Sequence, residues 1–146
     1  MLPAEILTDA DAALTAGEAA RGLHLVDHLL RTFPGHLRAR TLRAQMLLEL
    51  GDEDAAADAA TVLSADLLNV DALLVSARLA EAQGDLHQSH ALIGRAASIE
   101  PGHAGVRRAF ADSVTMLPRD AAALGLSYLA HGWPDLAERE LRAALA

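Results

Sequence analysis

Glycine recurs in this chain at a nearly constant interval. Gly17, Gly51 and Gly84 are 34 and 33 residues apart, and Pro34 and Pro101 are 67 residues apart, which is the sum of those two intervals. A period in this range is typical of stacked helix–turn–helix units. The sequence therefore predicts an all-α chain built from repeated helix pairs, an architecture that usually serves as a binding scaffold.

Small side chains recur at two places when the repeats are aligned on these glycines, with Gly132 as the fourth. Seven residues before the glycine they are Ala10, Ala44, Ala77 and Gly125, and five residues after it they are Gly22, Ala56, Ser89 and Ala137. Apolar residues follow at the ninth position, where they are Val26, Ala60, Ile93 and Leu141. Two antiparallel helices approach closely only where both present small side chains. We therefore expect helix pairs at 3–36, 37–69, 70–103 and 118–146, with an extra helix at 104–117.

Local signals indicate where the helices begin and end. Each turn glycine is expected to close a first helix in a left-handed conformation. Asp52 and Asp85 follow as N-caps or first-turn acids of the second helix. His36 and His103 come after prolines at equivalent positions, which indicates a repeated structural role. The second repeat has Leu68 in place of proline and is one residue short.

These recurring positions resemble the tetratricopeptide repeat. The last repeat matches its pattern most closely, at Leu124, Gly125, Tyr128, Gly132, Ala137 and Leu141. The resemblance implies one domain over 1–146, a right-handed α-solenoid of stacked antiparallel helix pairs with about nine helices. The chain departs from the pattern at 104–117, because Pro118 stands where the turn glycine belongs.

Composition excludes several kinds of chemistry. The chain has no cysteine, which removes disulfides, thiolate nucleophiles and sulfur-ligated zinc, and all 12 basic residues are arginine, which removes Schiff-base and phosphate-loop lysines. The net charge of −8 disfavours nucleic acid as a partner. The N-terminus lacks the basic region of a signal peptide, and no stretch is long and apolar enough to span a membrane. We therefore expect a cytoplasmic protein without a membrane partner.

No pattern of catalytic or metal-binding residues stands out. His24 and His28 are spaced to share a helix face and could hold zinc, but no third ligand is apparent, so we expect solvent-exposed histidines. The acidic run 52–54 with Asp58 lacks the spacing of a calcium loop and is better explained as a helix start. We therefore predict no catalytic residue, no metal site and no cofactor, so the chain is not expected to be an enzyme.

Two further features leave alternatives open. Arg40 and Arg43 fall at places that are usually apolar in the family, where their stems can be buried. Pairing with acids of a neighbouring repeat is favoured over anion binding for them. Trp133 begins the last helix, and it is either an exposed partner anchor or a staple of the helix entry.

The resemblance also implies a concave groove that is lined by the first helices and binds an extended or helical peptide. The residues that we predict to face the partner are Arg38, Thr41, Gln45, Glu49, Arg78, Glu81, Arg108 and Asp112. The basic clamp that some family members use for a chaperone C-terminus is absent, because its places hold Leu7, Asp11, Leu42, Asp71 and Val75.

The predicted function is a protein–protein interaction scaffold. One alternative is an N-terminal interaction or targeting module of a longer bacterial enzyme such as a transferase, since the last repeat ends before its closing proline and has no capping helix. Another is a chaperone similar to those of type III secretion. A homodimer through the uncapped C-terminal face is a further expectation.

Overall fold

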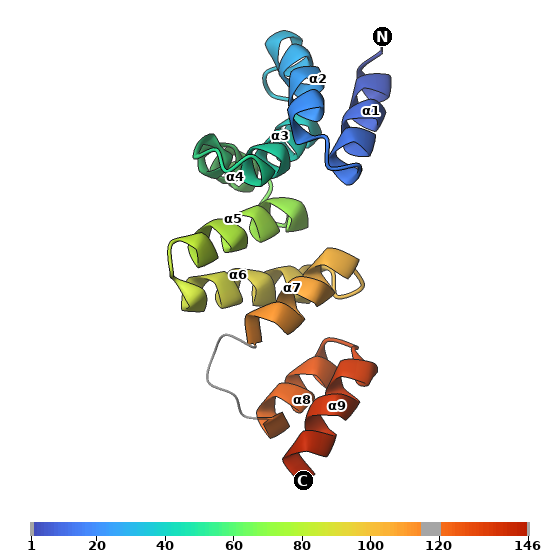
Figure 1. Ribbon diagram of the computed structural model, residues 1–146, viewed down its shortest axis with the longest axis vertical. Coiled ribbons are helices and arrows are strands. Elements are labelled where there is room, and N and C mark those ends of the chain that lie inside the picture. Colours follow the sequence, from blue (N-terminus) through green and yellow to red (C-terminus); the bar gives the residue numbers. More distant parts are fainter. Residues whose placement is uncertain (1, 115–120, 146) are drawn as a thin grey trace. The chain divides into compact units, whose positions relative to one another are not determined.

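The computed structural model describes the backbone of residues 2–114 and 121–145 and the side chains of residues 2–113 and 125–145. Regular structure in this part is entirely helical, so the all-α prediction is confirmed. The helices are α1 (Pro3–Thr15), α2 (Ala19–Thr32), α3 (Leu37–Glu49), α4 (Asp54–Ala65), α5 (Val70–Ala82), α6 (Leu86–Ile99), α7 (Ala104–Val114), α8 (Ala121–Ala130) and α9 (Pro134–Leu145) (Figure 1). They form two compact units, the N-terminal unit Met1–Leu79 and the C-terminal unit Ala80–Ala146. Among the described residues, no helix combines the length and the apolar character needed to cross a bilayer.

A left-handed glycine closes the turn inside each of four helix pairs. The backbone φ is +75° at Gly17, +70° at Gly51, +81° at Gly84 and +75° at Gly132. The residue after each glycine donates its N–H to the carbonyl five positions earlier, at N···O distances from 2.8 to 2.9 Å. This hydrogen bond is the one that defines the Schellman motif of helix C-termini. The predicted role of the recurring glycines is therefore confirmed.

A side-chain cap begins each of the helices α3, α5 and α7. The side chains of His36, Asn69 and His103 each accept the backbone N–H three residues later, at 3.3, 2.9 and 3.2 Å. The repeated structural role predicted for the two histidines is confirmed, and Asn69 fills the same position in the repeat between them. Asp85 caps α6 in the same way, at 3.0 Å, as the sequence predicts.

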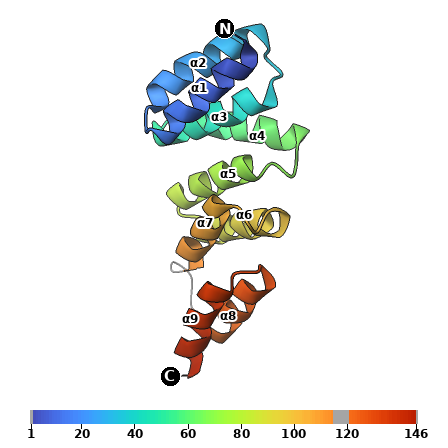
Figure 2. The same cartoon turned by 90° about the vertical axis from the view of Figure 1, so that its right-hand side faces the viewer.

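The helices of the N-terminal unit pack as close pairs. α1 lies against α2, α2 against α3, and α3 against α4 (Figures 1 and 2). Ala10, Val26 and Met46 are completely buried in one core cluster between these helices. A methyl group added at Gly22 would lie 2.4 Å from Met46 Cε and 3.4 Å from the Ala10 carbonyl oxygen. The glycine therefore leaves room for the Met46 side chain of α3 to pack against α2.

The second repeat corrects one part of the predicted alignment. Ala56 and Ala60 were expected at buried positions and are exposed, whereas Ala55 and Ala59 are completely buried. The missing residue of this short repeat therefore lies between Gly51 and Ala55, before the second helix. Every buried position of α4 is shifted by one residue as a result.

The C-terminal unit contains the predicted extra helix. α7 packs against α6, and α8 packs against α9 (Figure 2). A methyl group at Gly125 would lie 2.6 Å from Leu141 Cγ, so α8 and α9 meet at a small residue as predicted. The extra helix expected at 104–117 corresponds to α7 as far as Val114, while 115–117 and Pro118 lie outside the described residues.

Candidate functional site

Arg38 connects the first helices of three successive pairs in the N-terminal unit. Its Nη2 donates to Asp11 Oδ1 of α1 at 2.9 Å, and its Nη1 donates to Asp71 Oδ2 of α5 at 3.3 Å. The three side chains are partly exposed, so water screens these ion pairs, and each contributes roughly 0–1 kcal/mol. Their geometry is more informative than their energy, because it shows that α1, α3 and α5 present charged side chains to one common face.

Three other predicted partner-facing residues lie in the same unit and reach its surface. Gln45 and Glu49 follow Arg38 by about two and three turns of α3, so the three residues share one helix face. Glu49 and Arg78 are exposed, and Gln45 is partly exposed, although its amide oxygen is buried. We call Arg38, Gln45, Glu49 and Arg78, together with Asp11 and Asp71, the first-helix face.

Thr41 does not belong to this face. Its side chain is 1 % exposed, and its hydroxyl donates to the Leu37 carbonyl oxygen at 2.9 Å. The prediction that Thr41 contacts a partner is therefore wrong. Thr41 is offset from Arg38 by only about 60° around the helix, so its burial shows that the neighbouring helices cover α3 close to the edge of this face.

The remaining predicted partner-facing residues lie in the C-terminal unit. Glu81 is half-buried near the end of α5, whereas Arg108 and Asp112 are exposed on α7. Arg108 and Asp112 are four residues apart, which places them on one face of their helix. A binding role for these three residues stays a prediction.

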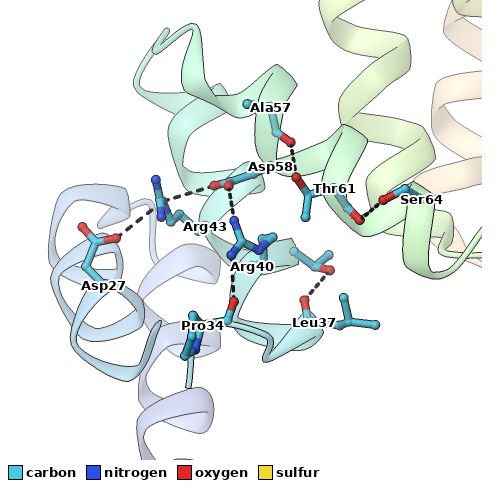
Figure 3. A network of polar contacts seen from close by, with 10 residues as sticks. Asp27, Pro34, Leu37, Arg40, Arg43, Ala57, Asp58, Thr61 and Ser64 are labelled. Atoms are coloured by element: carbon cyan, nitrogen blue, oxygen red, sulfur yellow. Dashed lines mark hydrogen bonds and ion pairs between the residues drawn. The ribbon is translucent and has the colours of Figure 1, made fainter. Parts of the chain in front are cut away.

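Asp58 of α4 lies between two arginines of α3. Arg40 Nη1 donates to Asp58 Oδ1 at 3.1 Å, and Arg43 Nε lies 3.1 Å from Asp58 Oδ2 (Figure 3). Arg40 also donates from Nη2 to the Pro34 carbonyl oxygen at 2.7 Å, and Arg43 Nε lies 3.5 Å from Asp27 Oδ1. The predicted pairing with an acid of a neighbouring repeat is therefore confirmed for Arg43, which contacts Asp27 of the first repeat, whereas Arg40 pairs with Asp58 of its own repeat. We call Asp27, Arg40, Arg43 and Asp58 the arginine network.

Burial governs the ionisation of Asp58. Only 5 % of its side chain is exposed, and the loss of hydration raises the pKa of its carboxyl above 3.8, although Arg43 and Arg40 both act to lower it. Arg43 Nε is not aligned for a hydrogen bond to Oδ2, which has no hydrogen-bond partner within the described part of the chain. Such a buried pair adds little stability over apolar residues, but removing one member leaves the other charge without compensation. The main effect of Asp58 is therefore to hold two guanidinium groups in place.

Trp133 belongs to a buried aromatic cluster of the C-terminal unit. Its side chain is 4 % exposed, and its Nε1 donates to the Pro101 carbonyl oxygen at 2.7 Å. The ring centroid of Phe110 lies 5.2 Å from that of Trp133, and His131 stacks on Trp133 at 5.2 Å. The alternative of an exposed partner anchor is therefore wrong, and Trp133 fixes the entry to α9.

The histidines separate into exposed and packed groups. His24 and His28 are exposed, as predicted, and His28 Nδ1 lies 3.5 Å from a terminal nitrogen of Arg31. His90 is half-buried, with Nδ1 2.9 Å from the Ser113 hydroxyl, and burial lowers the pKa of its imidazole below 6.5, with a smaller contribution from His87. Among the residues that the structure describes, no three histidine, aspartate or glutamate side chains gather closely enough to hold a metal ion.

Comparison of this chain with models of known protein families and with curated proteins finds no match. The side chains of the protein itself are therefore the only guide to its function. Two charged surfaces of the N-terminal unit stand out, the first-helix face and the arginine network. The sequence predicted most of the first face but did not predict that Asp11 and Asp71 meet at Arg38.

Proposed function

We propose that this protein is a tetratricopeptide-like interaction scaffold without catalysis of its own, whose repeats stack as a right-handed α-solenoid. The support is the recurrence of one local design. Left-handed glycines end the first helices of four pairs, and His36, Asn69 and His103 cap α3, α5 and the extra helix α7 in the same way. Rigid helix pairs present many side chains without ordering on binding, which lowers the entropic cost of capturing a flexible partner.

The observation that carries the proposal is the contact of Arg38 with both Asp11 and Asp71. It places three first helices on one face of the N-terminal unit. A peptide that lies across such a face can reach side chains from α1, α3 and α5 together. Binding by this route needs neither a deep cavity nor a cofactor.

The charge of the first-helix face favours a basic partner segment. Its three carboxylates, Asp11, Glu49 and Asp71, outnumber its two guanidinium groups, Arg38 and Arg78. Complementary charge accelerates encounter and rejects like-charged partners more than it adds affinity. We therefore propose a peptide or helix that carries a surplus of lysine and arginine around a few apolar anchors.

Selection from a random peptide library displayed on phage tests the proposal. We expect the whole protein to select related basic peptides, and the selected peptides to lose at least about tenfold in affinity for a Glu49→Ala, Arg78→Ala variant. The matched control is Arg21→Ala, Glu53→Ala, which removes one exposed arginine and one exposed glutamate elsewhere in the N-terminal unit. Equal affinity for both variants would show that the first-helix face is not the binding surface.

A further inference from the structure

A cavity of the N-terminal unit that is wide open to solvent gathers positive charge on the side of α3 opposite the first-helix face. It measures about 480 Å³ and is lined by His24, Asp27, Leu30, Arg31, Arg40 and Arg43. Arg40 and Arg43 point away from Arg38 on the same helix, because two and five residues correspond to rotations of about 200° and 140°. The cavity is therefore distinct from the proposed partner-binding face.

Arg40 and Arg43, which line the cavity, are held in position by contacts to residues outside its lining. Asp58 contacts Arg40 through Nη1 and Arg43 through Nε, and the Pro34 carbonyl accepts a second hydrogen bond from Arg40 (Figure 3). A guanidinium group fixed in this way loses little side-chain entropy when it binds a further group. The arginine network thus orders two guanidinium groups of the cavity before any ligand binds.

Several N–H donors of the arginines that line the cavity make no hydrogen bond within the described part of the chain. Arg43 contacts its acidic neighbours only through Nε, so both of its terminal nitrogens lack a hydrogen-bond partner within the described part of the chain. Arg31 makes one long contact, from Nη2 to His28 at 3.5 Å. Four N–H groups of Arg43 and further donors of Arg31 are therefore available to an acceptor.

The charged side chains around the cavity carry a net positive charge, which favours binding of an anion. Three guanidinium groups, on Arg31, Arg40 and Arg43, face two carboxylates, on Asp27 and Asp58, which leaves a net charge of +1. In a chain of net charge −8, this local surplus is opposite in sign to the protein as a whole.

We propose that this cavity binds the phosphate group of a small phosphorylated molecule. Guanidinium forks recognise phosphate oxygens by paired, charge-assisted hydrogen bonds. The volume exceeds what a bare phosphate needs and lies in the range of small-molecule sites. Leu30, of which 7 % is exposed, is the apolar residue of the lining.

Calorimetric titration of the whole protein at low ionic strength tests the proposal. The probes are inorganic phosphate, phenyl phosphate and, as a carboxylate of similar charge, succinate. We expect saturable binding of both phosphates, tighter for phenyl phosphate, and weaker binding of succinate. Arg31→Ala should weaken phosphate binding by about tenfold, whereas Arg21→Ala, an exposed arginine on the same helix, should leave it unchanged.

The outcomes separate the site from general charge effects. Arg31 is exposed and lies outside the contacts to Asp58, so its removal is not expected to disturb folding, and an unchanged circular dichroism spectrum checks this. An equal loss in the Arg31→Ala and Arg21→Ala variants, tighter binding of succinate, or no saturable binding of either phosphate would each overturn the proposal. Peptide binding at the first-helix face should be unaffected by Arg31→Ala, so failure of one proposal leaves the other standing.

Discussion

Replacing Gly22 by alanine tests how closely the helices pack in the N-terminal unit. The new methyl group would lie 2.4 Å from Met46 Cε, closer than such atoms approach, and 3.0 Å from its sulfur, which is tighter than most such contacts. Met46 is completely buried, so its side chain has little free space into which it can move. The Ala10 carbonyl oxygen, at 3.4 Å from the methyl group, limits movement on the other side.

Two opposing effects set the magnitude. Alanine in a helix interior is favoured over glycine by about 1 kcal/mol. Overpacking a well-packed core costs typically about 1–3 kcal/mol. The balance for Gly22→Ala is a loss of roughly 1 kcal/mol in the free energy of unfolding.

Gly94 provides a matched control in the middle of α6. Nothing lies within 4 Å of a methyl group added there, so Gly94→Ala keeps the gain in helix propensity without the clash. We expect it to stabilise the protein by about 0.5–1 kcal/mol. Urea titrations followed by circular dichroism give both values, and an unchanged m-value confirms that the unfolding transitions are comparable.

A second variant identifies the clashing side chain. Met46→Ala opens space for the methyl group, so the double variant should be more stable than the sum of the two single changes predicts, by about 1 kcal/mol. Stabilisation by Gly22→Ala equal to that by Gly94→Ala would refute the reasoning. So would strict additivity with Met46→Ala.

Three other predictions follow from the turns and the buried titrating groups. Gly84→Ala should destabilise the C-terminal unit by about 1–2 kcal/mol in urea unfolding because φ is +81°, whereas Gly102→Ala, a turn residue without a positive φ, should have little effect. The lowered pKa of His90 means that the folded protein binds fewer protons than the unfolded chain just below pH 6.5. Its free energy of unfolding should therefore fall as the pH drops from 6.5 through the folded-state pKa, and His90→Phe should remove this dependence. The raised pKa of Asp58 has the opposite sign, so the wild type should lose stability relative to Asp58→Asn as the pH rises from 3.8 through the folded-state pKa; a relative gain would contradict the assignment.

The sequence correctly predicted the features that depend only on neighbouring residues, such as the turns closed by glycine. A left-handed turn needs glycine, so Gly17 and Gly84 could be identified from their spacing alone. A shortened repeat is different, because the period shows that one residue is missing but not where. The burial of Ala55 in place of Ala56 depends on packing against neighbouring helices, which spacing does not report.

For contacts between residues distant in the sequence, the kind of partner could be predicted, but the partner itself could not. The positions of Arg40 and Arg43 indicated pairing with acids, but Asp58 had been grouped with an acidic helix start because it follows Asp54 closely. Its burial becomes evident only when α4 is placed against α3. Likewise, Trp133 at a helix start has the same sequence signal whether its ring is exposed or buried against Phe110.

Both proposed surfaces include arginines of α3, but the ion pairs of these arginines differ in how easily a ligand can displace them. Arg38 is nearly half exposed between two carboxylates, so water weakens its ion pairs, and a partner can displace them at small cost. Arg40 contacts a carboxylate that is 5 % exposed, so displacing it would leave a buried charge without compensation. A partner should therefore rearrange side chains on the first-helix face, whereas an anion should bind to the arginine network as it stands. Side-chain NMR of the free protein tests this difference. We expect Arg38 to exchange between rotamers, and Arg40 and Arg43 to remain fixed.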